Sequence, residues 1–328
     1  MKNCNLCPRN CFADRTVPDP AGFCRMGAEM RIARAAPHFW EEPCISGTRG
    51  SGTVFFAGCT ERCIYCQNRS ISHVTHAANA PGKTVSPEEL SDIMLSLQEE
   101  GVHNINLVTP THFANRIAEA IRIAKNRGLS VPVVYNTGGY EKAETLRMLD
   151  GLVDIYLTDF QHASREKSGR YSAVPDYPDV AIEALREMAR QTKCVLFEKG
   201  ITPGEYDTLC SLQSEDDDYR GPLMMRGMIV RHLVLPGETE DSLRVLEILR
   251  ALADEAGEGS FYLSIMNQYT PMLSDEDAKR YPALTRPLCA ESYESVIQAA
   301  EALHFPHVFF QYGETASESF IPPFSNSV

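Results

Sequence analysis

Three cysteines on one short stretch are the residues of this sequence best suited to metal chemistry. They have the spacing C-x3-C-x2-C at Cys59, Cys63 and Cys66, directly after Gly58 and the apolar run Thr53–Ala57. Three thiolates on one loop can bind three irons of an iron–sulfur cubane, because thiolates suit iron and carry the compensating negative charge. The fourth iron then has no protein ligand and can bind a small molecule. The alternative is a zinc knuckle that a distant Cys or His completes.

A second group of cysteines lies near the start of the chain, with the spacing C-x2-C-x3-C-x12-C at Cys4, Cys7, Cys11 and Cys24. Four thiolates are enough for a tetrahedral zinc ion or a four-ligand iron–sulfur cluster, and the spacing does not decide between them. A short stretch interrupted by prolines cannot build its own core, so a bound metal would stabilise it. Disulfides are not expected, because the N-terminus lacks the apolar segment of a secretory signal.

The charge of the chain is acidic and unevenly distributed. Of 328 residues, 31 are Lys or Arg and 44 are Asp or Glu, which gives a net charge of −13. The first 50 residues have a net charge of +2 and the remainder −15, so we expect residues 1–50 to form a distinct unit. An acidic chain argues against a broad nucleic-acid-binding surface. No run of 18 apolar residues occurs, so no membrane partner is expected and the cytoplasm is the expected location.

The elements that must position these cysteines alternate between short apolar runs and longer amphipathic ones. Strands are predicted at Thr53–Ala57, Asn104–Val108, Val131–Tyr135, Val153–Thr158, Met228–Val234, Phe261–Ile265 and Val308–Gln311. Helices are predicted at Ser86–Gly101, Phe113–Arg127, Asp179–Thr192, Asp241–Glu255 and Glu291–Leu303. This alternation indicates βαβ units and a parallel sheet, either open or closed into a partial barrel, with sites at the C-terminal ends of its strands.

Two further segments carry expectations of their own. The polar, Tyr-rich segment His162–Pro178 is predicted to be a long loop at the site, serving either as a docking rim or as a lid. Cys194 stands in the apolar stretch Cys194–Phe197 and is expected in the core.

The cysteine motif also has an aromatic residue, Tyr65, before its last cysteine. The pattern CxxxCx(aromatic)C resembles the hallmark of the radical S-adenosylmethionine (SAM) superfamily. Within it, the sequence is similar to the pyruvate formate-lyase activating enzyme-like branch, through Gly58–Asn68 and through Arg231–Gly237, which matches R-x-x-V-x-P-G. It also resembles an uncharacterised subgroup with an upstream cysteine cluster, in the segments Val108–His112, Tyr135–Tyr140 and Tyr171–Tyr177.

The resemblance covers nearly the whole chain and implies an α/β fold. This fold is a partial (β/α)6 barrel over residues 51–270, preceded by the cysteine-rich metal-binding extension of residues 1–50 and followed by a helix and strand in residues 271–328. It also implies a mechanism, in which a reduced [4Fe–4S] cluster donates one electron to the sulfonium of SAM. The molecule then breaks into methionine and a 5′-deoxyadenosyl radical, which abstracts hydrogen from a substrate. The protein binds and orients these groups and excludes water.

On this basis, the polar residues after the second and third strands are candidates for binding SAM. The family generally has Gly-Gly-Glu after the second strand, where it holds the methionine ammonium. This chain has Thr109 and Thr111 there, which offer carbonyl and hydroxyl acceptors instead. After the third strand, Asn136 and Thr137 are placed for ribose hydroxyls, and Gly138–Gly139 allows close backbone approach.

The later strands provide further candidates. The resemblance suggests Asp-x-Lys after the fourth strand, and here Asp159 matches while Gln161 replaces the lysine. Arg231, in the fifth strand, is expected at the methionine carboxylate, with a structural ion pair as the alternative. The residues expected at adenine or ribose are Tyr65, Gln67, Asn267 and Gln268. Second choices are His112, His162 and His232.

Three classes of function remain open. We favour a radical SAM enzyme that abstracts hydrogen from a glycyl radical enzyme or another polypeptide, with a flavodoxin- or ferredoxin-type electron donor as partner. The second class is a radical SAM enzyme that acts on a small molecule. The third is a non-catalytic iron–sulfur or zinc protein, which would leave a three-ligand loop on a six-strand scaffold unexplained.

Overall fold

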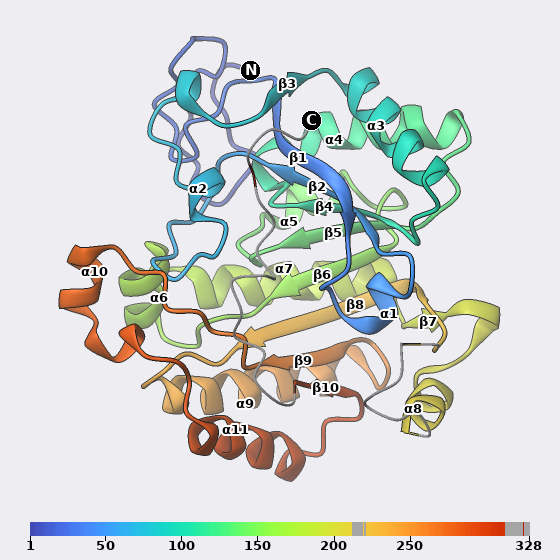
Figure 1. Cartoon of the computed structure of the whole chain (residues 1–328), viewed down its shortest axis with the longest axis vertical. Helices are drawn as coiled ribbons and strands as arrows, with labels where there is room; N and C mark the ends of the chain where they lie inside the picture. The colour runs from blue at the N-terminus through green and yellow to red at the C-terminus, as the bar shows by residue number, and fades with distance from the viewer. Residues whose placement is uncertain (212–218, 220, 312–323, 325–328) are drawn as a thin grey trace.

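The structure is a computed structural model that describes residues 1–211, 219, 221–311 and 324 (Figure 1). Its strands are β1 (Met30–His38), β2 (Ser51–Phe56), β3 (Lys83–Val85), β4 (Ile105–Val108), β5 (Val133–Thr137), β6 (Ile155–Asp159), β7 (Leu196–Phe197), β8 (Met224–Leu233), β9 (Tyr262–Met266) and β10 (Val308–Phe310). Its α-helices are α1 (Pro43–Ser46), α2 (Arg69–Ser72), α3 (Pro87–Glu99), α4 (Ala114–Asn126), α5 (Ala143–Arg147), α6 (Arg165–Ser172), α7 (Tyr177–Thr192), α8 (Pro203–Ser211), α9 (Thr239–Ala256), α10 (Asp275–Arg280) and α11 (Ala290–Ala302). None of the helices described is long and apolar enough to cross a membrane.

The predicted strands and helices are confirmed to within a few residues at their ends. Helix α3 shows why the sequence signals worked. The Ser86 hydroxyl accepts from the Glu89 backbone N–H at 3.2 Å, and the Glu89 carboxylate accepts from the Ser86 backbone N–H at 2.7 Å. Together with Pro87 at the first helical position, this reciprocal cap begins the helix where the sequence predicts.

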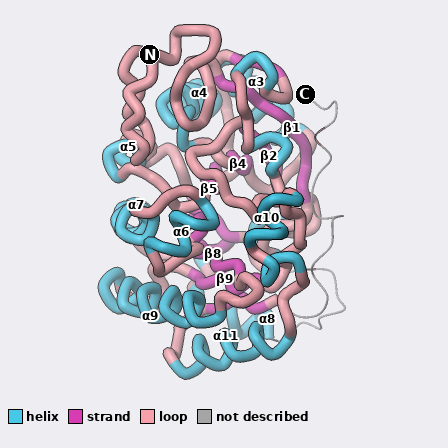
Figure 2. Tube along the Cα trace, turned by 90° about the vertical axis from the view of Figure 1, so that its left-hand side faces the viewer, coloured by secondary structure: helices cyan, strands magenta, loops and turns pink. Residues whose placement is uncertain are grey.

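The strand order decides between an open sheet and a partial barrel. Strands β2, β4, β5, β6, β8, β9 and β10 are parallel neighbours in the order of the chain. Right-handed crossovers between sequential strands put all the connecting helices on one face, whereas a doubly wound sheet reverses its order part-way. Figures 1 and 2 show α4, α7 and α9 following the strands along that face. The fold is therefore the α/β radical SAM-type partial barrel that the resemblance implies.

Strand β8 shows how the two faces differ. Met228 and Val230 pack into the core between the sheet and helices α7 and α9. The alternate residue Ile229 belongs to a separate cluster inside the sheet, with Cys44 and Ile45 of α1. This cluster closes the end at which the parallel strands begin, so the polar side chains at their other end face an open pocket.

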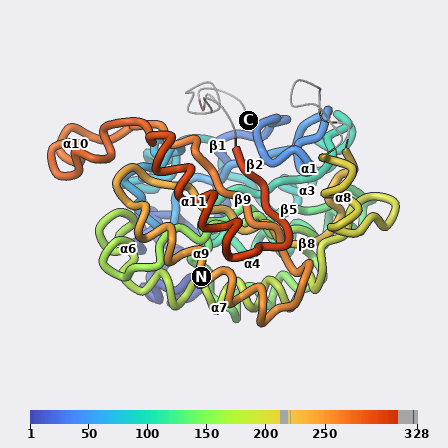
Figure 3. The backbone as a smooth tube through the Cα atoms, turned by 90° about the horizontal axis from the view of Figure 1, so that it is seen from below, coloured from blue at the N-terminus to red at the C-terminus, as the bar shows by residue number. Residues whose placement is uncertain are grey.

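The edge of the sheet next to β2 contains two strands, β1 and β3, that were not predicted. β1 lies within residues 1–50 but pairs antiparallel with β2 from Ile32 to His38, and β3 pairs antiparallel with β1. Residues 1–29 contain no helix or strand. The extension is therefore joined to the sheet through β1, and its boundary at residue 50 stays a prediction. At the other edge, α11 and β10 follow β9, and α10 lies at the periphery of the molecule (Figure 3).

Two sequence expectations are wrong. The segment His162–Pro178 is not a long loop, because it contains α6 and the start of α7. Its polar composition hid a helix that the Ser164 hydroxyl caps by accepting from the Lys167 backbone N–H. Cys194 is exposed rather than in the core, because it precedes the two-residue strand β7, and the buried neighbour is Val195.

Candidate active site

One pocket lies at the C-terminal ends of the parallel strands. It brings together the predicted catalytic cysteines and all but Asn267 of the polar side chains expected first at the cofactor: Cys59, Cys63, Cys66, Tyr65, Gln67, Thr109, Thr111, Asn136, Thr137, Asp159, Gln161, Arg231 and Gln268. These residues come from six different βα segments. Their convergence follows from the parallel topology, which places all of those segments at one end of the sheet.

The cysteine loop begins at a position that requires glycine. Gly58 has φ +81°, and a Cβ there would lie 2.6 Å from the Met26 side chain and 2.9 Å from the Cys24 carbonyl oxygen. The catalytic loop and the N-terminal extension are thus in close contact. Burial raises the pKa of the thiols of Cys59, Cys63 and Cys66.

These thiols fit an iron–sulfur cluster better than a single ion. No group of three or more His, Cys, Asp or Glu side chains within the described ranges is arranged to hold one metal ion. A cubane binds each thiolate through a different iron, so its ligands need to face one space rather than meet at one point. The three thiols meet this condition, since all line the same pocket. Buried thiols also need positive charge to ionise, which irons provide.

Tyr65 connects the cysteine loop to the elements behind it. Its hydroxyl lies 3.1 Å from His162 Nε2 and 3.1 Å from Ser172 Oγ. His162 Nδ1 lies 3.6 Å from an Asp241 carboxylate oxygen, which favours the proton on Nδ1 and leaves Nε2 as an acceptor. The phenol is therefore held by α6 on one side and by a histidine oriented from α9 on the other.

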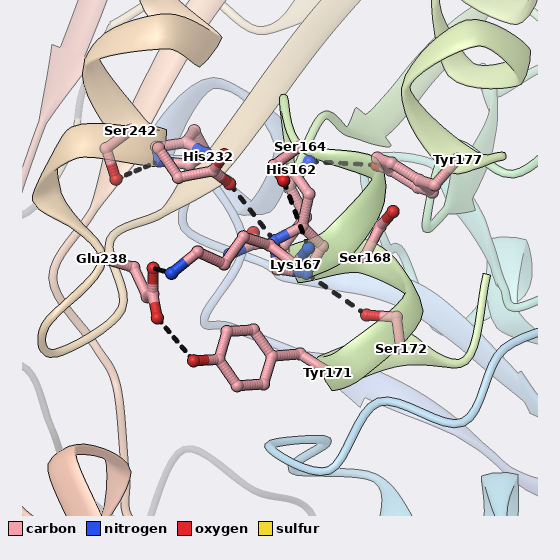
Figure 4. Close-up of polar contacts among 12 residues, drawn as sticks. His162, Ser164, Lys167, Ser168, Tyr171, Ser172, Tyr177, His232, Glu238 and Ser242 are labelled. Atoms are coloured by element: carbon pink, nitrogen blue, oxygen red, sulfur yellow. Dashed lines mark hydrogen bonds and ion pairs between the residues drawn. The ribbon is translucent and has the colours of Figure 1, made fainter. Parts of the chain in front are cut away.

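Helix α6 fixes the backbone of the same loop. The Arg62 and Ile64 N–H groups donate to the carbonyl oxygens of Ser172 and Tyr171, at 3.0 and 2.8 Å. At the opposite side of α6, Lys167 forms an ion pair with Glu238 at 2.5 Å, and the Tyr171 hydroxyl donates to the other Glu238 oxygen (Figure 4). The expected lid is thus an anchored brace between the cysteine loop and the β8–α9 turn.

Arg231 is engaged by the chain's own acceptors. Its guanidinium donates to Asp159 Oδ1 at 2.8 Å, to Asn136 Oδ1 at 2.8 Å and to Glu41 Oε2 at 3.3 Å. Burial raises the pKa of Asp159, and Arg231 opposes that rise. The ion pair that we considered as the alternative is present, and the role of Arg231 at a cofactor carboxylate stays a prediction.

The amide of Gln161 is also occupied. Its Nε2 donates to the Leu233 carbonyl oxygen at 2.7 Å, and its Oε1 accepts from the Leu233 N–H at 3.2 Å. It thus caps the end of β8 while lining the pocket. Gln67 donates to the carbonyl oxygen of Gln268 at 3.1 Å, which joins the cysteine loop to the segment after β9.

The Gly138–Gly139 turn lies where backbone and carboxylates crowd. A Cβ on Gly138 would lie 2.3 Å from Glu61 Oε1, and one on Gly139 would lie 2.2 Å from the Asp159 carbonyl oxygen. Close approach was the expected reason for these glycines, and the geometry agrees. The pKa of Glu61 is raised to about 8, by burial first and by Asp159 second, while Arg9 opposes the rise.

Several pocket residues were missed. Besides Glu61, they include His38, Trp40, Glu41, Phe55 and Met266. Glu41 had no motif around it, because the signal is the fold itself: β1 returns along β2 and delivers the following residues into the sheet interior. Phe324, one described residue of the C-terminal stretch, packs edge-to-face on Phe55 with ring centroids 5.3 Å apart.

The three second-choice histidines do not line this pocket, and their described contacts are structural. His112 Nε2 lies 2.8 Å from the Ala57 carbonyl oxygen, and burial lowers its pKa to about 3. His232 contacts the Phe160 carbonyl oxygen and Ser242, and burial lowers its pKa to about 4. Asn267 donates its backbone N–H to Gln311 at 2.9 Å, beside β10.

The N-terminal cysteines are brought into one neighbourhood beside the catalytic loop. The pKa of Cys7 is raised to about 12, chiefly by burial and to a lesser extent by the nearby thiols of Cys24, Cys4 and Cys11. Arg9 Nε donates to the Thr60 carbonyl oxygen at 2.9 Å, and Arg62 donates to the Phe23 carbonyl oxygen at 3.0 Å. The extension therefore packs directly on the loop that carries Cys59 and Cys63.

Comparison with known proteins agrees with this arrangement. Residues 53–205 match the family described as "Radical SAM superfamily". The match covers just under half of the chain. Similarity to this superfamily implies a [4Fe–4S] cluster and SAM as cofactors.

Two individual proteins are also similar. The uncharacterized protein MJ0674 of Methanocaldococcus jannaschii is 27% identical over 315 residues, which cover 94% of this chain and 77% of that protein. The crystal structure of SuiB from Streptococcus suis aligns with a TM-score of 0.45 and 12% identity, over 78% of this chain. The aligned chain spans 47% of SuiB.

Proposed function

We propose that this radical SAM enzyme holds a [4Fe–4S] cluster through Cys59, Cys63 and Cys66 and abstracts hydrogen from a polypeptide substrate, as members of the pyruvate formate-lyase activating enzyme-like branch do. The observation that carries the proposal is the one pocket that joins these thiols to polar residues from six parallel segments of the barrel. When bound, the cluster and SAM supply a carbon-centred radical that removes a hydrogen atom from the substrate.

The residues of the chain bind, orient and shield these groups. The thiols of the loop hold the cluster, while Tyr65 and the α6 brace fix the loop that carries them. The ends of β4 and β5 present hydroxyl and amide groups to the methionine and ribose parts of SAM. The apolar cluster that contains Ile229, Cys44 and Ile45 closes the end of the barrel opposite the pocket and excludes water from that side.

A polypeptide substrate is supported by the mouth of the pocket. Phe39 and Trp40 are exposed there, at 51% and 57%, and Trp40 lines the pocket. Phe324 packs on Phe55, so this ring, which also lines the pocket, can receive an aromatic side chain. The anchored helix α6 also does not provide the lid that a small substrate would favour. A small-molecule substrate remains the second candidate.

We also propose that Cys4, Cys7, Cys11 and Cys24 bind a second metal centre, zinc or iron–sulfur. Their thiols, like those of the catalytic loop, are not arranged to hold a single ion among the described residues, so a zinc ion would require them to move closer together. Their mutual proximity supports the proposal, as does the position of Arg15, whose Nη1 lies 3.9 Å from Cys4 Sγ. Arg15 also opposes the rise that burial causes in the pKa of Cys24. A cation beside several thiols favours the ionised form that metal binding requires.

The proposed activity is tested in the absence of oxygen. The protein is reconstituted with iron and sulfide, and release of 5′-deoxyadenosine from SAM is measured in the presence of a strong reductant. A glycyl doublet in the electron paramagnetic resonance spectrum, after mixing with a glycyl radical enzyme encoded nearby in the genome, supports the polypeptide substrate. Transfer of deuterium from labelled metabolites into deoxyadenosine, without a protein radical, overturns it. Absence of deoxyadenosine from a sample with full iron content overturns the activity itself.

A further inference from the structure

A buried carboxylate stands behind the pocket wall formed by the ends of β4 and β5. Glu141 is 1% exposed, and the hydroxyls of Thr111 and Thr137 both donate to its Oε1 at 2.5 Å. Thr111 begins the turn after β4, and Thr137 ends β5. Both threonines line the pocket, whereas Glu141 does not, so this carboxylate acts on a ligand through the threonines.

The backbone brings Glu141 to this place through the Gly138–Gly139 turn. Gly139 has φ +83°, where a Cβ would collide with the Asp159 carbonyl oxygen, and the Glu141 N–H donates to the Gly139 carbonyl oxygen at 2.9 Å. The turn folds the chain back toward β4. Glu141 therefore reaches Thr111, thirty residues earlier in the sequence, as well as Thr137 at the end of the preceding strand β5.

These hydrogen bonds determine that this part of the pocket wall accepts hydrogen bonds from a ligand. A hydroxyl has one hydrogen, and an ionised carboxylate can only accept, so both threonine hydrogens are directed at Glu141. The free lone pairs of Thr111 and Thr137 then face the ligand as acceptors. A group that binds here must therefore donate hydrogen bonds, as an ammonium or a hydroxyl does.

The charge of Glu141 also lacks a counter-ion in the described part of the chain. None of the ion pairs there includes it, and its second oxygen is buried without a hydrogen-bond partner. Burial raises its pKa to about 7, and the hydrogen bonds from the two threonines oppose that rise. A cationic ligand beside the threonines would compensate this charge and favour the ionised carboxylate.

We propose that Glu141 is a positioning residue for the ammonium group of SAM: it holds Thr111 and Thr137 as acceptors and supplies the opposing charge. This inference rests on the proposed function. It explains how the chain can bind the methionine part although Thr109–Thr111 stand where the family generally has Gly-Gly-Glu. The negative charge that opposes the ammonium comes instead from Glu141, in the segment after β5.

The test compares two ligands on the reconstituted holoenzyme by equilibrium dialysis. S-adenosylhomocysteine carries the ammonium, and 5′-methylthioadenosine lacks the whole amino-acid part. Glu141→Gln keeps the size and removes the charge, and should weaken S-adenosylhomocysteine binding about 10- to 100-fold. Binding of methylthioadenosine should change less than about threefold. Glu144→Gln, an exposed acid on α5, is the matched control.

A second pair of variants tests the same inference if the Glu141→Gln protein does not fold. Thr137→Val removes the acceptor and should reproduce the selective loss, whereas Thr137→Ser should retain binding. Equal affinity of parent and Glu141→Gln for S-adenosylhomocysteine would overturn the inference, as would an equal loss for both ligands. If the parent binds neither ligand, the proposed function fails instead, so the two failures are distinguishable.

Discussion

At the scale of single residues, the charges around the pocket are out of balance. Arg231 is paired with Asp159 and Glu41, whereas Glu61 and Glu141 are buried and belong to none of the ion pairs of the described residues. Burial raises the pKa of both unpaired carboxyls. SAM carries a sulfonium and an ammonium against one carboxylate, so its binding would offset part of this negative charge. The pocket is thus electrostatically suited to a cation.

The ion pairs of Arg231 predict a large effect on stability. Arg231→Ala leaves the half-buried Glu41 and Asp159 without their cation, which should reduce the free energy of unfolding by about 3 kcal/mol, the low end for a broken buried pair, because Asp159 is partly exposed. Neutralising both partners, as Glu41→Gln and Asp159→Asn, should restore much of it in the triple variant. Urea denaturation is the measurement. Arg226→Ala, an exposed arginine on the same strand, is the control. A stable Arg231→Ala protein would show that these pairs contribute little.

The catalytic thiols give the most direct prediction. Replacing Cys59, Cys63 and Cys66 by Ala should abolish SAM cleavage and the brown charge-transfer absorbance of that cluster, because no other described cysteine lines the pocket. Cleavage is measured as deoxyadenosine released per chain. The exposed Cys289 replaced by Ala serves as the control and should retain both properties. Undiminished cleavage in the triple variant would refute the assignment.

At the scale of elements, α6 determines how rigidly the cysteine loop is held. The helix contacts the loop through Tyr171 and Ser172 and contacts the β8–α9 turn through Lys167 and Tyr171. A loop that binds a cluster through three residues needs fixed ligand positions, since misplaced ligands cost affinity. The position of α6 between two strand ends provides that constraint.

Loosening α6 should therefore expose the loop backbone. In the double variant Lys167→Met and Tyr171→Phe, the amides of Arg62 and Ile64 should exchange with deuterium about tenfold faster than in the parent. Hydrogen-exchange mass spectrometry of peptides spanning the loop measures this. Arg165→Met, also on α6, removes only an exposed ion pair with Asp179 of α7 and should leave exchange unchanged. Equal exchange in parent and double variant would mean that α6 does not brace the loop.

The elements also show how much of the fold the sequence predicts. The spacing of apolar residues and the signals at helix ends located the parallel strands and their helices. Parallel topology then predicted which residues share one end of the sheet. Helix α6 was missed because its residues are mostly polar, so its apolar face is narrow. Glu41 and Glu141 were missed for another reason: both reach the site through a return of the chain, and a sequence pattern does not reveal which distant groups such a turn will meet.

At the scale of the whole molecule, buried histidines couple folding to pH. Burial lowers the pKa of His232 to about 4, below the value of about 6.5 in an unfolded chain. The unfolded state thus binds more protons between pH 4 and 6.5, and this contribution to stability falls as pH falls through that range, by up to about 1.4 kcal/mol per unit. The buried carboxyls Glu61 and Glu141, with raised pKa, act in the opposite direction.

The difference between two proteins isolates the histidine. His232→Gln cannot titrate, so its stability relative to the parent should improve as pH is lowered from 6.5 to 4, even though the variant is less stable at pH 7. Chemical denaturation across this range measures the difference. A difference that does not change with pH would show that His232 is charged or solvated in the folded state.

The contact between the N-terminal extension and the barrel gives the last prediction. Residues 1–29 have no helix or strand, yet Cys4 and Cys7 are buried and Arg9 and Arg62 join the extension to the catalytic loop. Such a segment has few other means of holding its shape, so a metal bound by the four thiols is the economical explanation.

The protein with Ala at 59, 63 and 66 should still contain a single zinc or about four irons per chain. Further replacement of Cys4, Cys7, Cys11 and Cys24 by Ala should remove that metal and increase proteolysis within the extension, while Cys194→Ala should change neither. A folded triple variant that contains neither metal would exclude the second centre, and the ratio of zinc to iron in a metal-bearing one would identify it.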